Sequence, residues 1–235
     1  MRLLLQPIAM TQPTHTARIW DLPTRLFHWT LAASVIALVI TAKTGAMLWH
    51  ERLGYAVLAL LVFRIVWGLI GGRWSRFAAF VYSPARLLNY LRGAPHPEDS
   101  VGHSPLGALS VWGLLTVLAA QVASGLMSDD EIAFTGPLTR FVSNAVVGQA
   151  TGYHKEIGQY LVIGLVALHL LAILYYVLVR RQRLVRPMLQ GDKALPQPVT
   201  PSRDDVATRL LALVVLAASG ALAWWVSTLG QAAAF

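Results

Sequence analysis

Five long apolar runs, separated by polar segments, dominate the pattern of this sequence. They cover about residues 26–48, 53–71, 105–127, 153–179 and 206–229. Each run is close to the ~20 residues that a helix needs to cross a bilayer. Apolar runs of this length are typical of transmembrane helices, not of strands or amphipathic surface helices. The pattern therefore predicts an all-α integral membrane bundle in contact with lipid.

The composition supports this prediction. Of the 235 residues, 56% are hydrophobic and 13% charged, with a mean hydropathy of +0.56. A soluble domain is usually about half apolar and about one quarter charged. The chain has no cysteine, which excludes disulfides, thiolate-held iron–sulfur clusters, cysteine-ligated zinc and covalent c-type haem attachment.

The charged residues predict how the chain crosses the membrane. The net charge is +8, and the arginines gather before the first run, between the second and third, and between the fourth and fifth. These basic segments alternate with segments that carry few basic residues, which favours a cytoplasmic N-terminus and a periplasmic C-terminus. The same distribution argues against a nucleic-acid-binding surface. The acidic loop at Asp129, Asp130 and Glu131 would then face outwards. The first 18 residues contain too short an apolar stretch for a signal peptide, and we expect them to form a loose cytoplasmic tail.

The fourth apolar run carries two histidines, His154 and His169. On a helix, fifteen residues span ~22 Å and turn the chain roughly 60° beyond whole turns. The two imidazoles would thus lie near opposite leaflets, on broadly the same side of one helix. An imidazole inside a membrane helix needs a partner, and a metal ion is a good one.

Two further histidines match these depths. In the predicted topology, His28 begins an outward-going helix near the inner face, and His50 begins the return helix near the outer face. Two pairs follow: His28 with His169 inside, and His50 with His154 outside. Pairs of neutral imidazoles without nearby carboxylates suit axial ligation of haem iron. A di-iron site needs inward-facing glutamates, and zinc needs three or four close ligands. A haem with both axial positions filled mainly carries electrons.

Glycines follow the outer histidines at one helical turn. His50 and Gly54, and His154 and Gly158, share the form His-x-x-x-Gly. A glycine on the histidine's face would let a flat porphyrin approach closely. The alternative is that glycine is simply frequent in membrane helices.

Three other polar residues fall near the predicted inner pair. Arg64 lies within the second apolar run, where it would neutralise a haem propionate or extend to the inner surface. Arg25, one turn before His28, would meet a propionate or anchor the topology. His103, ahead of the third run, is a candidate for replacing an axial ligand, binding a propionate or protonating a quinone.

Several motifs in order resemble the bacterial cytochrome b561 family, which includes the b-type cytochrome subunits of nickel–iron hydrogenases. They are Trp20-Asp21-x-x-x-Arg25-x-x-His28-Trp29, Trp49-His50-Glu51-x-x-Gly54-Tyr55 and Phe63-Arg64-x-x-Trp67-Gly68. The resemblance covers about residues 19–187. It implies a four-helix core that holds two b haems on the same four histidines and exchanges electrons with a quinone pool. The fifth apolar run departs from that pattern.

The expected organisation is a tail at residues 1–18, a di-haem domain at 19–187, a Pro-rich linker at 188–205, and a fifth helix with a short outer C-terminus at 206–235. The expected function is electron transfer across a bacterial inner membrane, between the quinone pool and either a small reductant or a redox partner such as a cytochrome c or a dehydrogenase or hydrogenase subunit. One alternative is a superoxide oxidase that delivers electrons to ubiquinone. The other is a non-redox transporter or assembly protein, which would leave the four histidines unexplained.

Overall fold

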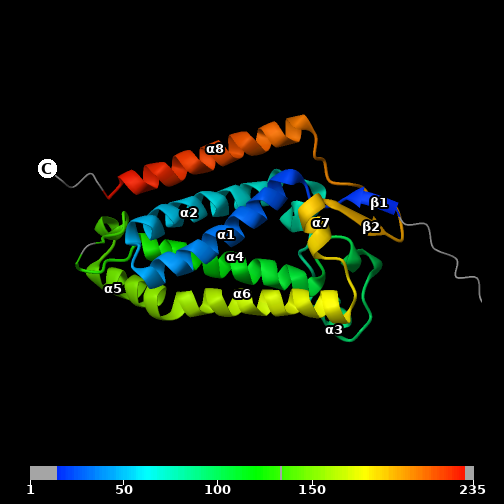
Figure 1. The fold of residues 1–235 in the computed structure, drawn as a ribbon, viewed down its shortest axis with the longest axis horizontal. Helices are drawn as coiled ribbons and strands as arrows, with labels where there is room; N and C mark the ends of the chain where they lie inside the picture. The colour runs from blue at the N-terminus through cyan, green and yellow to red at the C-terminus, as the bar shows by residue number, and fades with distance from the viewer. Residues whose placement is uncertain (1–14, 133, 231–235) are drawn as a thin grey trace, which may run out of the picture.

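The structure is a computed structural model, and it describes residues 15–132 and 134–230. Among these residues, five helical spans are long and apolar enough to cross a membrane (Figure 1). The prediction of an all-α membrane bundle is therefore confirmed. In chain order, the helices and strands are β1 (His15–Arg18), α1 (Leu22–Thr44), α2 (Met47–Ile70), α3 (Pro84–Leu91), α4 (Pro105–Leu126), α5 (Asn144–Gly152), α6 (Gln159–Leu174), α7 (Val185–Gln190), β2 (Asp192–Leu195) and α8 (Val206–Thr228).

Short irregular helices extend this framework. One π-helical segment, Tyr153–Gly158, joins α5 to α6, and a second, Tyr175–Val179, follows α6, so that residues 144–179 form one continuous helix. The remaining elements are the 3₁₀ turns Arg73–Ser75, Phe77–Ala79, Pro97–Ser100 and Thr139–Phe141. His154 therefore lies in a π-helical turn, a helix distortion that occurs often at functional sites.

Helix α1 begins and ends earlier than the apolar run at 26–48 predicts. Asp21 caps its start by accepting a hydrogen bond of 2.8 Å from the backbone N–H of Thr24. Gly45 ends it with φ +73°, a left-handed conformation that favours glycine. Helix α2 then starts at Met47, before the apolar run at 53–71, so His50 lies in its first turn.

Helix α2 is the centre of the bundle, because α1, α4 and α8 all pack against it. One apolar cluster joins Phe27 of α1 and Phe63 of α2 to Ala212 of α8. A second joins Val57 of α2 to Leu118 of α4 and Val162 of α6. Most of the other large apolar side chains on the helices are exposed, as expected for surfaces that face lipid.

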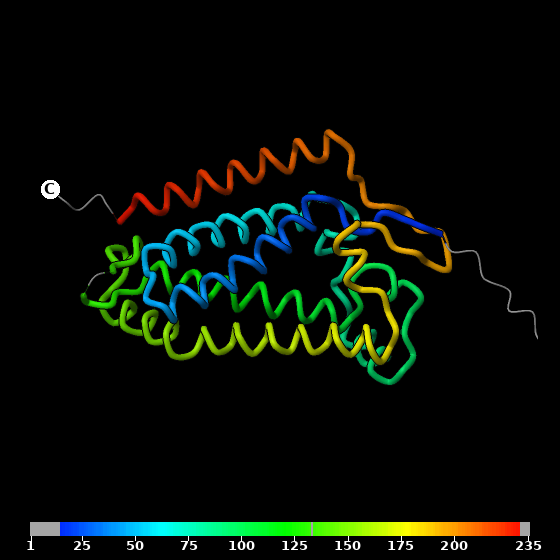
Figure 2. The backbone as a smooth tube through the Cα atoms, viewed as in Figure 1, coloured from blue at the N-terminus to red at the C-terminus, as the bar shows by residue number. Residues whose placement is uncertain are grey.

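The two ends of the bundle differ in construction (Figure 2). At one end, which we call the sheet end, β1 pairs with β2 in an antiparallel sheet. The expectation of a loose tail is therefore wrong for residues 15–18, while residues 1–14 lie outside the described part. The predicted linker at 188–205 is likewise ordered, since it contains β2 and Ser202, whose backbone N–H donates to the Arg18 carbonyl. We call the opposite end, with the loop between α4 and α5, the pocket end.

Candidate functional site

A cavity of about 490 Å³ opens between α1, α2, α4 and α6 near the pocket end. Its walls are mainly aliphatic, and its volume falls in the range of pockets that hold cofactors. The lining includes Val35, Leu38, Val39, Leu118, Val122, Val162, His50, His154, Gly54 and Gly125. The structure thus brings His50 and His154 together in one apolar cavity.

The two histidine rings are arranged as a pair. Their centroids lie 6.1 Å apart, with an angle of 86° between the ring planes. An imidazole nitrogen binds a metal at ~2 Å, with the ring centre ~1 Å beyond, so two rings across one metal ion lie about 6 Å apart. The observed separation therefore fits two axial ligands of one haem iron.

Backbone carbonyls orient both rings. The Nδ1 of His50 lies 3.0 Å from the carbonyl oxygen of Leu38, and the Nδ1 of His154 lies 2.9 Å from that of Gln121. Because a carbonyl oxygen only accepts, each Nδ1 carries the proton and donates it. Each Nε2 then keeps a free lone pair, the state that a metal-binding histidine needs.

The glycines around this pair have different roles. An added Cβ at Gly54 would meet nothing within 4 Å, and Gly54 lines the cavity. Gly158 instead packs against the side chain of Gln121, so its lack of a side chain serves the contact between α4 and α6. Sequence reasoning missed Gly125, where an added Cβ would lie 2.8 Å from the Cε1 of His154.

The rim of the cavity carries balanced charge. Lys43 and Lys155 line it together with Glu51 and Asp130. The Nζ of Lys43 donates to the Oε1 of Gln159 at 3.3 Å. Two cations and two carboxylates therefore line the cavity, without an excess of either charge.

His28 and His169 lie near each other towards the sheet end, close enough for their charges to interact. The Nδ1 of His28 is buried and has no hydrogen-bond partner among the described residues. The Nδ1 of His169 lies 3.4 Å from the Ser110 hydroxyl. Both histidines are partly buried, and the Nδ1 of His28 is an unsatisfied polar atom.

His103 packs close to this second pair. Its ring lies 4.4 Å from that of Phe80 and 4.7 Å from that of Trp20, and its buried Nδ1 also has no partner among the described residues. Burial, reinforced by the positive charge of Arg64, lowers the pKa of His103 to about 3. The ring is therefore neutral at physiological pH.

Arg64 is buried and bonded within the protein. Its side chain does not extend to the surface, since the residue is only 4% exposed. Its Nη1 donates to the Ser75 carbonyl at 3.0 Å, and its guanidinium lies over the Phe77 ring at 4.7 Å. The charge of Asp21, which is fully buried, acts on it. Sequence reasoning had not identified Asp21 as the counter-charge, although Asp21 belongs to the first of the quoted motifs.

Arg25 reaches the segment that follows α6. Its Nη1 donates to the Leu189 carbonyl at 2.6 Å, and its Nη2 lies 4.0 Å from an Asp204 carboxylate oxygen. Its Nε is buried without a partner among the described residues. The structure therefore connects Arg25 to the sheet end and leaves one donor available.

Comparison with known proteins adds one finding to this geometry. A family model described as prokaryotic cytochrome b561 matches residues 19–191. No curated protein and no solved structure matches the chain. Within residues 15–132 and 134–230, no three metal-binding side chains cluster closely enough to hold an ion by themselves. His50 and His154, which the structure brings together, are a donor pair that suits axial ligation of haem iron.

Proposed function

Because this chain belongs to the prokaryotic cytochrome b561 family of membrane electron-transfer proteins that bind haem b, we propose that it is a di-haem cytochrome. In this proposal, electrons cross the inner membrane between a redox protein or small reductant and the quinone pool. The single observation that carries it is the pair of histidines, His50 and His154, in one apolar cavity with their Nδ1 atoms bound to carbonyls.

His50 and His154 are the proposed axial ligands of the first haem. When bound, the haem supplies reversible one-electron transfer at its iron. The carbonyls of Leu38 and Gln121 fix the ring orientation and keep the protons on Nδ1. The aliphatic walls exclude water, and Gly54 leaves room for a flat macrocycle beside His50.

His28 and His169 are the proposed ligands of the second haem. Of the candidates near the sheet end, His28 is the one that interacts with both His169 and His103. His28 lies within the spanning helix α1, whereas His103 lies in the loop before α4, which favours His28 over His103 as the partner of His169. Arg25 retains a free buried Nε and is the better candidate for a propionate. The charge of Asp21 already acts on Arg64, so Arg64 does not need a propionate as a counter-charge.

The two proposed haem sites lie towards opposite ends of the bundle. Since His154 and His169 are ~22 Å apart along one helix, the sites together would connect the two faces of a membrane. The arginine-rich sheet end would face the cytoplasm and the pocket end the periplasm. A quinone would exchange electrons with one haem, and a redox protein or small reductant with the other.

A superoxide oxidase is the less favoured alternative. Steering of a small anion needs an excess of positive charge at the entrance. The balance of Lys43 and Lys155 against Glu51 and Asp130 provides no such excess.

The test is the haem content of the detergent-purified chain, measured as the pyridine haemochrome per protein. We expect two b haems in the unchanged chain. His50→Ala should retain only the second haem and His28→Ala only the first, and the spectra of the two variants should differ. The exposed His15 provides a control, and His15→Ala should retain both haems. His103→Ala should also retain both. A loss in His103→Ala without a loss in His28→Ala would refute the second ligand pair, and no haem in well-folded protein would refute the proposal.

A further inference from the structure

A second hollow, of about 370 Å³, lies at the sheet end and is distinct from the histidine sites. It is formed by the two 3₁₀ turns after α2, by the start of the α3 segment and by the loop before α4. Its lining contains three arginines, Arg73, Arg76 and Arg86, and one carboxylate, Glu98. Trp74 and Tyr82 supply aromatic rings to the same walls.

Two of these arginines have no carboxylate partner. Among the described residues, neither Arg73 nor Arg76 forms an ion pair, whereas Arg86 binds Asp99 at 2.7 Å and lies 3.7 Å from Glu98. Arg73 and Arg76 are both exposed. The hollow therefore has an excess of positive charge that the protein itself does not neutralise.

The guanidinium groups are held in place before any ligand binds. The Nε of Arg76 donates to the Gly71 carbonyl at 3.0 Å, and its two Nη groups have no hydrogen-bond partner within residues 15–132 and 134–230. Arg86 lies over the Tyr82 ring at 4.7 Å, and Arg73 over the Trp74 ring at 5.6 Å. Fixed guanidinium groups suit the oxygens of a phosphate, which they bind through paired N–H donors.

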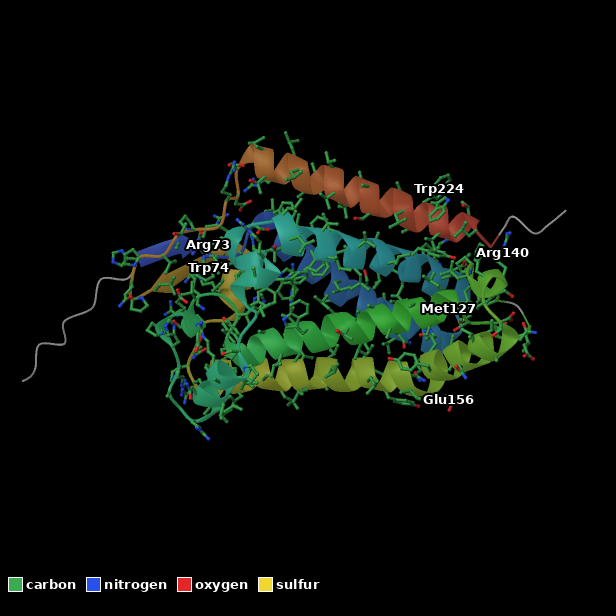
Figure 3. The ribbon with its side chains drawn as sticks, turned by 180° about the vertical axis from the view of Figure 1, so that it is seen from behind. Arg73, Trp74, Met127, Arg140, Glu156 and Trp224 are labelled. Carbon is green, nitrogen blue, oxygen red and sulfur yellow. The ribbon has the colours of Figure 1, made fainter. Side chains whose placement is uncertain are left out.

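The hollow also lies beside apolar surface at the end of the spans. Figure 3 shows Arg73 and Trp74 at the sheet end, where α2 leaves the bundle. Val81, which lines the hollow, is 67% exposed, and Leu88 and Leu91 of α3 are exposed nearby. Charge beside exposed aliphatic side chains at this depth matches the boundary between lipid headgroups and acyl chains.

We propose that this hollow binds the phosphate of an anionic phospholipid, with Arg73 and Arg76 as the main contacts and Val81 beside the glycerol and acyl region. The recognised chemistry is a phosphate ester, which a free phosphate ion shares. The apolar rim favours the lipid. Because none of these residues contacts the proposed haem ligands in the structure, the proposal stands or fails separately from the function above.

The test compares lipid binding by the haem-loaded full-length chain and two variants. Native mass spectrometry counts phosphatidylglycerol and phosphatidylcholine adducts in a mild detergent, and a parallel arm adds inorganic phosphate alone. The pocket variant is Arg73→Gln/Arg76→Gln. The control is Arg92→Gln/Arg183→Gln, which removes two exposed arginines of the same end from outside the hollow. Haem content is measured on every sample.

We expect one tightly bound phosphatidylglycerol, displaced by excess phosphatidylglycerol but not by phosphatidylcholine. The pocket variant should bind it roughly thirtyfold more weakly, while the control binds as the unchanged chain does and all samples keep their haem. Equal weakening in both variants would mean unspecific surface attraction and overturn the proposal. Unchanged binding in the pocket variant would overturn it as well. Competition by inorganic phosphate at equal concentration would overturn the lipid assignment and leave a free-phosphate site.

Discussion

Asp21 is the residue whose replacement tests the architecture of the sheet end most directly. It has no exposed surface. Its carboxylate accepts hydrogen bonds from the Thr24 backbone at 2.8 Å, the Ser75 hydroxyl at 2.7 Å and the Trp67 indole at 3.2 Å. It is also the counter-charge of buried Arg64. We expect Asp21→Ala to destabilise the protein severely.

The size of the effect follows from these contacts. A hydrogen bond to a charged group contributes about 1.5–3 kcal/mol. Loss of the Asp21 charge also removes an attraction on the Arg64 guanidinium, which stays buried and bonded only to the Ser75 carbonyl among the described residues. These terms overlap and do not add. We therefore expect the free energy of unfolding to fall by about 4 kcal/mol in Asp21→Ala.

The assay is denaturant unfolding in detergent micelles, followed by tryptophan fluorescence and far-ultraviolet circular dichroism. Asp205→Ala is the matched control, because Asp205 also caps a helix by accepting from the Thr208 backbone but has an exposed side chain. The loss of unfolding free energy in Asp205→Ala should be well below half of that in Asp21→Ala. The double variant Asp21→Ala/Arg64→Met should recover part of the stability, since it removes both charges. Equal losses in the two single variants, or no recovery in the double variant, would refute the reasoning.

Two more predictions concern single contacts. Gly125→Ala should displace the His154 ring and shift or weaken the spectrum of one haem. Gly113→Ala is the control and should leave the spectrum unchanged, because an added Cβ there meets nothing within 4 Å. Identical spectra of the two variants would contradict the role of Gly125. Burial alone would raise the pKa of Asp204, but hydrogen bonds from Arg209, the Leu22 backbone and Arg18 hold this pKa below its ordinary value. Its stabilising effect is therefore present above pH ~4 and lost as the pH falls further. Melting temperatures from pH 6 to pH 3 should thus fall more in the unchanged chain than in Asp204→Asn, and parallel curves would contradict this.

The spans were predictable from the sequence, and their ends were not. Twenty consecutive apolar residues leave a membrane helix as the main option, because a bilayer offers the backbone no other hydrogen-bond partners. The ends depend on single residues that hydropathy does not weigh. Asp21 starts α1 four residues before the apolar run, and Gly45 ends it inside the run. Helix α2 likewise starts at Met47, before the second apolar run, so that it includes His50.

The approach of His50 to His154 followed from depth along the helices, but what orients the two rings did not. The groups that accept hydrogen bonds from His50 and His154 are backbone carbonyls. Every residue has such a carbonyl, so the sequence does not indicate which of them will form these bonds. The sequence indicated the role of Gly125 only weakly, as a small residue near the end of the third apolar run. Arg64 was placed near the correct end of the bundle. The influence of the Asp21 charge on it was not foreseen, because only the folded sheet end brings these two segments near each other.

Helix α8 shows how a segment outside the family match can still belong to the folded unit. Lipid offers no hydrophobic drive for one helix to join another, so close packing and polar contacts must hold it. Small residues supply the packing, since Ala212, Ser219 and Ala223 are the buried positions of α8. The polar contact is the Arg18 Nη1, which donates to Asp204 at 2.5 Å directly before the helix. Because Arg18 also binds Asp192 of β2, the same ion pairs that close the sheet end fasten α8 to the four-helix bundle.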